Sequence, residues 1–477
     1  MAMVASRFDP ASYRDRRARV LELDGRMLRV IAADAAEDVA WLEREGLLAD
    51  LVASGRVIPT WRTEVPADVP HGFAATVALE HERLPFISYP YEWPFSALKA
   101  AALFHLDLHR DLLSRGASLV DASAYNVQFR GTRPIMIDVL SLRPYREGEY
   151  WLGHQQFLDQ FLNPLLLHAM LGVAPHRLYR GALEGVPTPL LARLLRLRHK
   201  LRPGVFFNVV LPARLQRLAS KARVDTARAM RHRPLPKRSH VALLAGLRRT
   251  IAKLEARPDA VSSWRDYPTT SGYDGAEVER KRCFVAEYVG RMRPRLMLDL
   301  GCNTGTYAAL ALGAGAAEVI GVENDPDAAD QAFRRAEREG LALLPLVVDA
   351  ADPSPAQGWQ GLERRSFAVR SRFDGMIALA FAHHLAIGRN VRLDQLVAWL
   401  VGCAPHGVIE FVPKSDPRVQ WLLRLREDVF SDYSRENFAA LLGRSARIVR
   451  QETISASGRE LYWYERSTPA SGAAGTP

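Results

Sequence analysis

The chain of 477 residues has few of the features that mark secreted, metal-binding or membrane proteins. It contains only three cysteines, Cys283, Cys302 and Cys403, whose wide spacing fits neither a zinc motif nor a disulfide framework. No run approaches the roughly 20 apolar residues that a membrane-spanning helix needs. The first residues also lack the apolar segment of a cleavable signal. We therefore expect a cytoplasmic protein with no membrane span and no bound metal.

Two common phosphate-binding motifs are also absent from the most informative stretch of the chain. An apolar run that indicates a buried strand ends in Asp299-Leu-Gly301-Cys-Asn303-Thr-Gly305, and a helix-like run follows. The order of strand, glycine turn and helix is typical of a nucleotide-like ligand site at the carboxyl end of a sheet. The spacing is Gly-x-x-x-Gly, and no Gly-Lys-Ser/Thr follows. A dinucleotide or ATP is therefore disfavoured at this turn.

Three further apolar runs carry polar residues that suit the same ligand. The second run ends in Glu323, 22 positions after the first glycine of the turn, where a carboxylate can accept from a ribose diol. The third run ends in Asp349, whose carboxylate can accept from an adenine amino group. The fourth includes Asp374 and leads into His383 and His384.

This succession resembles the motifs of the Rossmann-like (class I) S-adenosylmethionine-dependent methyltransferases over roughly residues 270 to 466. The resemblance implies an α/β, doubly wound domain at the C-terminus with S-adenosyl-L-methionine as cofactor. It also implies a cofactor-binding set, which is Asp299, Gly301, Asn303, Gly305, Glu323, Asp349 and Asp374. Asn303 stands where the family usually has a glycine, but asparagine tolerates left-handed backbone. Most of the chain, including this glycine turn and Trp264, Tyr267, Tyr273 and Lys281, also resembles the nodulation-protein NoeA-like group of bacterial methyltransferases.

The region after the fourth strand is where we expect the chemistry. Methyl transfer from a sulfonium is an in-line displacement, in which the protein orients the reactants and supplies a base where one is needed. His383 or His384 could remove a proton from an acceptor hydroxyl or amine. The alternative is that one packs under the sheet and the other caps a turn. Glu410 and Lys414, at the end of a fifth strand, could orient the substrate.

The amino-terminal region, residues 1–185, carries a second pattern. Asp121 is followed after four residues by Asn126, and a later apolar strand ends in Asp138. This pattern is similar to the catalytic and metal-binding loops of the protein-kinase and aminoglycoside-phosphotransferase superfamily. In that superfamily the first Asp accepts a hydroxyl proton, while the Asn and the second Asp hold magnesium.

Several departures argue against phosphotransfer by this region. Leu119 stands where the superfamily usually has His, no Gly-rich loop precedes it, and the first lysine of the chain is Lys99. Arg29 is the nearest substitute for the phosphate-binding lysine, and arginine replaces that point charge poorly. We expect an α+β, kinase-like scaffold without kinase activity. The alternative is an ordinary α+β domain in which Asp121 and Asn126 make turn hydrogen bonds.

Between these regions lies a strongly basic segment. Residues 193–253 contain 17 Lys or Arg and a single acid, although the net charge of the chain is only +11. A basic helical face can meet nucleic acid, but aromatic residues are nearly absent from the segment, so nucleic acid is not favoured as a partner. We expect a basic helical connector over 186–260, a methyltransferase domain over 261–466 whose segment 264–273 forms a lid, and a disordered tail over 467–477.

The sequence leaves three functions open. The leading one is methylation of an O or N acceptor on a small molecule or glycan-like metabolite. The motifs that hold an exocyclic base amine or supply a Pro-Cys nucleophile are absent, which disfavours nucleic-acid bases. The alternatives are an RNA or protein methyltransferase that is recruited through the basic segment, and a non-catalytic scaffold with nucleotide-binding folds. The sequence indicates no oligomeric state.

Overall fold

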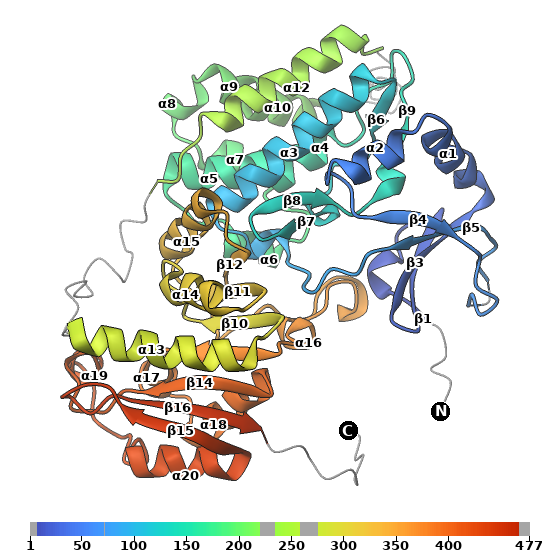
Figure 1. Ribbon diagram of the computed structural model, residues 1–477. Coiled ribbons are helices and arrows are strands. Elements are labelled where there is room, and N and C mark those ends of the chain that lie inside the picture. The colour runs from blue at the N-terminus through green and yellow to red at the C-terminus, as the bar shows by residue number, and fades with distance from the viewer. Residues whose placement is uncertain (1–6, 71, 220–233, 258–274, 467–477) are drawn as a thin grey trace. The chain divides into compact units, whose positions relative to one another are not determined.

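The chain forms two compact units in the computed structural model, which describes residues 7–70, 72–219, 234–257 and 275–466 (Figure 1). The first unit comprises 1–260 together with the short segment 354–367. The second comprises 261–353 and 368–477. The expected lid over 264–273 and the expected disordered tail over 467–477 lie outside the described residues. None of the described helices has the length and apolarity that crossing a membrane requires.

A seven-stranded sheet forms the centre of the second unit, with the order β12-β11-β10-β13-β14-β16-β15. The first five strands of this order are parallel, and β16 and β15 are antiparallel additions at one edge. The strands are β10 (Leu296–Leu300), β11 (Glu318–Glu323), β12 (Leu343–Val347), β13 (Gly375–Ala378), β14 (His406–Phe411), β15 (Ala446–Thr453) and β16 (Glu460–Arg466).

Helices cover both faces of this sheet, which explains why its parallel strands are continuous apolar runs. The helices are α13 (Gly275–Met292), α14 (Thr306–Ala314), α15 (Pro326–Glu339), α16 (Phe367–Arg370), α17 (Ala382–Ala386), α18 (Leu393–Cys403), α19 (Pro417–Leu423) and α20 (Arg435–Ser445). Successive side chains of β16 point to opposite faces of the sheet. Trp463 packs with α13 residues such as Tyr288, whereas Tyr462 contacts Phe438 of α20. The expected α/β methyltransferase fold is confirmed.

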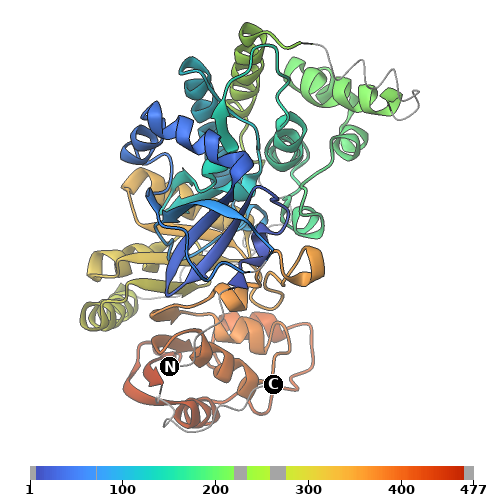
Figure 2. The ribbon, with the colours of Figure 1, turned by 90° about the vertical axis from the view of Figure 1, so that its right-hand side faces the viewer.

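The first unit begins with an antiparallel sheet of order β1-β2-β3-β5-β4, drawn in blue in Figure 2. Its strands are β1 (Arg7–Phe8), β2 (Ala18–Leu23), β3 (Arg26–Ala32), β4 (Thr60–Thr63) and β5 (Ala75–His81). Two short pairs follow, which are β6 (Ala117–Leu119) with β9 (Leu142–Pro144) and β7 (Val127–Arg130) with β8 (Arg133–Met136).

The rest of the first unit is mostly helical. Its longer helices are α1 (Ala33–Arg44), α2 (Leu47–Ala53), α3 (Phe95–Ser114), α5 (Asn163–Leu171), α6 (His176–Gly181), α7 (Thr188–Leu194), α10 (Leu211–Ala219) and α12 (Lys237–Ala252). Single turns form α4 (His154–Phe157), α8 (Leu197–Lys200) and α9 (Pro203–Val205). The apolar face of α3 is buried along its length, so this helix lies in the core of the unit.

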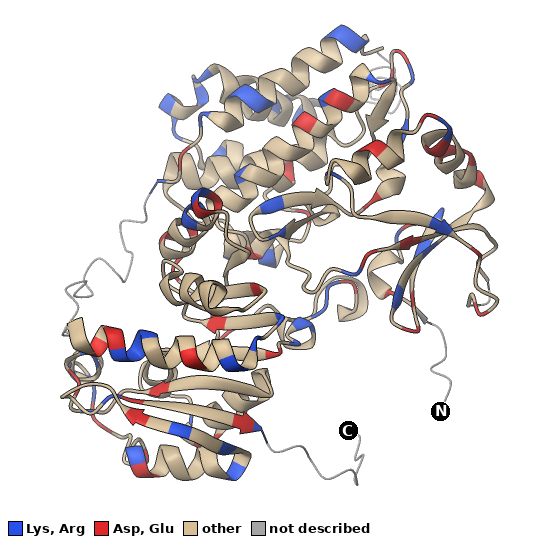
Figure 3. Ribbon diagram, viewed as in Figure 1, with Lys and Arg blue, Asp and Glu red and all other residues tan. Residues whose placement is uncertain are grey.

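In the described residues, the basic segment is part of the first unit and not a separate connector. Helix α12 packs along α3 through a buried stripe, His240, Leu244, Leu247 and Ile251. That spacing of three to four residues is the apolar face of an amphipathic helix. Lys and Arg lie on several of these helices, as Figure 3 shows in blue. The expectation of a separate connector over 186–260 is therefore not confirmed, and the many charges of this segment hid the apolar stripe of α12 in the sequence.

The methyltransferase domain expected over 261–466 is not continuous in the structure. Residues 354–367, which follow β12 in the chain, belong to the first unit. Within that unit Glu363 accepts from Arg14 Nε at 3.0 Å, and the Arg364 guanidinium lies 4.0 Å from the centre of the Tyr125 ring. The Tyr89 hydroxyl accepts from the Arg365 amide at 2.9 Å.

Candidate functional site

The glycine turn after β10 has the left-handed geometry that its sequence predicts. Gly301, Asn303 and Gly305 have φ of 75°, 48° and 77°. The amides of Gly301 and Cys302 donate to the Val322 carbonyl of β11 at 2.8 and 3.1 Å. The turn therefore lies at the carboxyl ends of two parallel strands, the edge at which α/β folds bind ligands. Asn303 replaces the usual glycine without loss of the left-handed turn.

Glu323, the last residue of β11, is bound to the same turn. Its Oε2 accepts from the Asn303 amide at 2.9 Å, and its Oε1 accepts from the amides of Asn324 and Asp325 at 2.8 and 2.9 Å. Burial raises the pKa of Glu323, and these amides oppose the rise. Each carboxylate oxygen has further acceptor capacity, so Glu323 can take the two hydroxyls of a ribose.

Asp299 lies in β10, just before the turn, and one of its carboxylate oxygens accepts no hydrogen bond from the described residues. The residue is 2% exposed, and its Oδ2 has no hydrogen-bond partner among the described residues. Burial, with the charge of Glu323, raises the pKa of Asp299 to about 7, while Lys281 opposes the rise. A buried oxygen with no protein partner beside a glycine turn suits a donor from a ligand, such as the ammonium of S-adenosylmethionine.

The two remaining acids differ in their relation to the turn. Asp349 follows β12 at the same edge of the sheet, where its Oδ1 accepts from the Ala351 amide at 2.9 Å and its Oδ2 from Arg389 at 2.7 Å. Asp374 precedes β13 and accepts from the amides of Arg295 and Leu296 at 3.1 Å, at the amino ends of the strands. The expectation that Asp374 binds the cofactor was wrong, because it lies at the opposite edge from the glycine turn.

His383 and His384 lie together in α17, just after β13, with ring centres 4.1 Å apart. His383 is fully buried, and neither of its ring nitrogens has a partner among the described residues. His384 is half-buried. Burial, together with the guanidinium groups of Arg418 and Arg459, lowers the pKa of His384 to about 4. Burial also lowers the pKa of His383, so both imidazoles are neutral at pH 7, the form in which histidine accepts a proton, and a pKa of about 4 makes His384 a weak base.

Next to these histidines is a buried network of four charges. Glu410 of β14 accepts from Lys281 at 2.5 Å and from Arg459 at 3.2 Å. Arg459 also binds Asp416 through two nitrogens, at 2.7 and 3.0 Å. Burial alone would raise the pKa of Glu410, but Lys281 and Arg459 hold it below its ordinary value. Glu410 is therefore ionised and already engaged, while Lys414 pairs with Asp428 at 2.8 Å.

Sequence reasoning missed this network because its members come from three segments that lie far apart in the chain, namely Lys281, residues 410–416 and Arg459. The only signal in the sequence was Lys281 on the apolar side of α13, next to Phe284 and Val285. A lysine there needs a buried partner, since unpaired buried charge is costly. Nothing local identified Arg459 as a part of it.

The pattern of the first unit also comes together. The Asn126 side chain donates to Asp121 Oδ2 at 3.1 Å and lies 3.4 Å from Asp138 Oδ2. Arg29 of β3 donates to the other oxygen of Asp138 at 2.7 Å. Ser141 donates to Asp138 Oδ2 at 2.5 Å. Both oxygens of the carboxylate expected to hold magnesium in a kinase are thus taken by protein donors.

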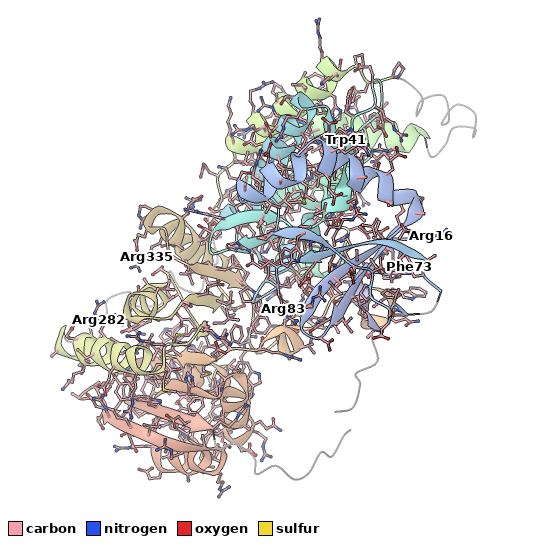
Figure 4. The ribbon with its side chains drawn as sticks, turned by 45° about the vertical axis from the view of Figure 1, so that its right-hand side comes forward. Arg16, Trp41, Phe73, Arg83, Arg282 and Arg335 are labelled. Carbon is pink, nitrogen blue, oxygen red and sulfur yellow. The ribbon has the colours of Figure 1, made fainter. Side chains whose placement is uncertain are left out.

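A shallow groove of about 480 Å³ lies elsewhere on the second unit, over α13 and α14. Its lining includes the small residues Ala286, Ala309 and Gly313, together with Arg282 and Arg335, which are labelled in Figure 4. The groove does not include Asp299, Glu323 or either histidine of α17.

Three features together define the class of this unit. They are the sheet order with its antiparallel edge, the glycine turn, and the acid on the ribose side. The second unit is that of a Rossmann-like, S-adenosylmethionine-dependent methyltransferase. The chain is 44% identical over 459 residues to nodulation protein NoeA of Rhizobium meliloti (strain 1021), a match that covers 96% of this chain and 95% of that protein. The chain therefore belongs to the NoeA family.

Other comparisons cover less of the chain. The ribosomal protein L11 methyltransferase of Xanthomonas euvesicatoria pv. vesicatoria (strain 85-10) is 38% identical over 108 residues, 23% of this chain and 34% of that protein. Among solved structures, N-methyltransferase NodS from Bradyrhizobium japonicum WM9 has a TM-score of 0.31 at 13% identity, over 41% of this chain and 99% of that one. Magnesium protoporphyrin IX methyltransferase from Synechocystis PCC 6803 has a TM-score of 0.29 at 17% identity, over 40% and 80%. No family model matches.

Proposed function

We propose that the protein transfers the methyl group of S-adenosyl-L-methionine to an oxygen or nitrogen of a small molecule or glycan-like metabolite. The observation that carries the cofactor half of this proposal is the pair of buried carboxylates at the glycine turn. Asp299 has an oxygen without a partner in the part of the chain that the structure describes, and Glu323 is fixed to the turn by the Asn303 amide. Bound there, the cofactor supplies the reactive methyl group.

We propose the following cofactor contacts, which the geometry of the turn supports. Gly301, Asn303 and Gly305 open the backbone for the ligand, Asp299 accepts from its ammonium, and Glu323 accepts from its ribose. Asp349 remains our candidate for the adenine side, since it ends β12 at the same edge and is held by Arg389. The cytoplasm is the proposed location, in keeping with the three unpaired cysteines of the described residues.

We propose His384 as the group that takes a proton from the acceptor, with His383 as its packing partner. His384 is half-buried and neutral, whereas His383 is fully buried. His384→Ala should therefore lower turnover at least tenfold, as expected for loss of general-base assistance. Affinity for S-adenosylhomocysteine should not change. The measurement is transfer of labelled methyl to a panel of acceptors, and His383→Ala is the matched control. Equal activity of the two variants would contradict the assignment.

For the first unit we propose a kinase-like scaffold that binds substrate or partner without phosphotransfer. The supporting observation is that Arg29 and Ser141 engage both oxygens of Asp138. The protein should then show no hydrolysis of ATP in the presence of magnesium. Hydrolysis that is lost in Asp121→Asn would refute this reading.

A protein or RNA acceptor is the second candidate, supported by the partial match to ribosomal protein L11 methyltransferases and by the 17 basic residues of 193–253. This candidate predicts that residues 193–253 bind a polyanion such as RNA, and that the affinity falls steeply as the salt concentration rises. Absence of any salt-dependent RNA binding would leave only the protein acceptor in this second candidate.

A further inference from the structure

The turn that joins β13 to α17 has an unusual backbone. Ala380 has φ of 49°, in the left-handed region that a residue with a Cβ seldom adopts. Such a conformation persists only where its surroundings hold it, and it is found most often at functional sites. The sequence offers no glycine or asparagine at this position, so the cause must lie in the contacts of the turn.

One buried carboxylate holds this turn. The Ala380 amide donates to Glu410 Oε2 at 2.8 Å. The same oxygen accepts from Lys281, and the other accepts from Arg459. Glu410 is 0% exposed, so these three donors hold it in one place. An amide bonded to an ionised and fixed carboxylate makes a strong hydrogen bond.

The residues that follow Ala380 include one that contacts the glycine turn and the two histidines of α17. Phe381, the next residue, packs on the glycine turn so closely that a Cβ at Gly301 would lie 3.0 Å from its ring. His383 and His384 follow in α17. The conformation of Ala380 therefore sets the position of a cofactor-side ring and of both candidate proton acceptors.

We propose that Glu410 is a positioning residue for methyl transfer, which acts by holding Ala380 in its left-handed conformation. In this way it keeps Phe381 against the glycine turn and the α17 histidines beside the acceptor. The placement of Phe381 requires only that S-adenosylmethionine binds at the glycine turn. The placement of the histidines rests on the proposed function. Glu410 itself contacts neither reactant in this account. Its ion pairs with Lys281 and Arg459 fix the carboxylate that holds the turn.

The competing explanation is that Glu410 serves only the stability of the charge network. Asp416 gives a matched control, because it binds the same Arg459 side chain and, among the described residues, its hydrogen-bond partners do not include the Ala380 turn, which Glu410 holds. Glycine at position 380 separates the explanations further. Glycine adopts left-handed backbone without strain, so Ala380→Gly should make the turn independent of Glu410 without repairing the network.

The test compares S-adenosylhomocysteine affinity, by calorimetry, with the thermal midpoint in five full-length proteins. These are the wild type, Glu410→Ala, Asp416→Ala, Ala380→Gly and the double variant Glu410→Ala/Ala380→Gly. Both carboxylate deletions should lower the midpoint. Only Glu410→Ala should weaken binding, by about tenfold, which is the equilibrium equivalent of left-handed strain on one alanine. Glycine at 380 should restore most of that affinity but not the midpoint.

Two results of the main comparison would overturn the positioning role while leaving the cofactor site standing. One is equal affinity of the Glu410 and Asp416 variants, and the other is failure of Ala380→Gly to restore binding. Where Glu410→Ala does not fold, Glu410→Gln carries the test. Its amide oxygen can still accept from Ala380, so its affinity should stay near wild type, and a tenfold loss would contradict the role of the turn. A wild type that does not bind would overturn the cofactor site itself, and the positioning role with it.

Discussion

Substitution of Gly301 by alanine tests the geometry of the glycine turn, and the chain supplies its own control. Gly301 and Gly340 have similar left-handed φ, 75° and 65°. An added Cβ at Gly301 would lie 3.0 Å from the Phe381 ring, whereas a Cβ at Gly340, at the end of α15, meets nothing within 4 Å. The two variants therefore share the backbone strain and differ in what the new methyl group touches.

The magnitudes follow from these two terms. Left-handed backbone costs an alanine about 1–2 kcal/mol, which both variants should lose in the free energy of unfolding. Overpacking against Phe381 adds about 1–3 kcal/mol in Gly301→Ala alone. Because the same methyl group narrows the approach to the turn, affinity for S-adenosylhomocysteine should fall at least about tenfold in that variant.

The assay is urea unfolding followed by calorimetric titration of each folded variant with S-adenosylhomocysteine. Gly340→Ala should bind as the wild type does, despite its lower stability. Equal affinity of the two variants would refute the reasoning, because it would show that the turn at Gly301 does not face the ligand. A drop of affinity in Gly340→Ala would show instead that general destabilisation controls binding.

Two further predictions concern pH. Asp299 has its pKa raised to about 7 in the free protein, and the ligand's ammonium needs the ionised carboxylate. Affinity should therefore weaken up to about tenfold per pH unit below 7, and Asp299→Asn should bind weakly with no such dependence; a parallel pH profile in that variant would exclude Asp299. In the first unit, burial lowers the pKa of His105 from 6.5 to about 4. Because the folded protein holds the neutral imidazole, protonation favours the unfolded chain. The stability is therefore complete above pH 6.5 and falls as the pH drops toward 4. By linkage, His105 alone lowers the free energy of unfolding by about 2 kcal/mol between pH 7 and pH 5. Urea midpoints that do not change between pH 7 and pH 5 would contradict this.

The cofactor turn could be predicted from sequence because its determinants are local. Strand, glycine turn and helix are adjacent in the chain, and Asn303 adopts the left-handed φ that its side chain tolerates. Parallel strands bring their carboxyl ends to one edge, so an acid that ends a strand, such as Glu323, is placed by topology alone. The fold of the second unit followed from the same order of strands and helices.

Asp374 shows where this reasoning fails. The acid was read as part of the fourth strand, but β13 begins at the following residue, Gly375. An acid that precedes a strand lies at the amino edge, where Asp374 accepts from the amides of Arg295 and Leu296. A boundary difference of one or two residues therefore moved a candidate ligand to the wrong side of the sheet.

Two other features depend on pairings that sequence spacing does not encode. Arg459 reaches Glu410 and Asp416 only after β14 and β16 have paired. The segment 354–367 leaves the second unit between β12 and β13 and packs within the first through Glu363 and Arg364.

The central claim is that the edge formed by Asp299, the glycine turn and Glu323 binds S-adenosylmethionine. Calorimetric titration of the purified protein with S-adenosylhomocysteine tests this claim most directly, with Glu323→Ala as the paired variant. We predict micromolar binding at one site per chain, weakened at least about tenfold in Glu323→Ala by loss of a charged hydrogen-bond acceptor. No binding by the folded wild type, or equal binding by the variant, would contradict the account.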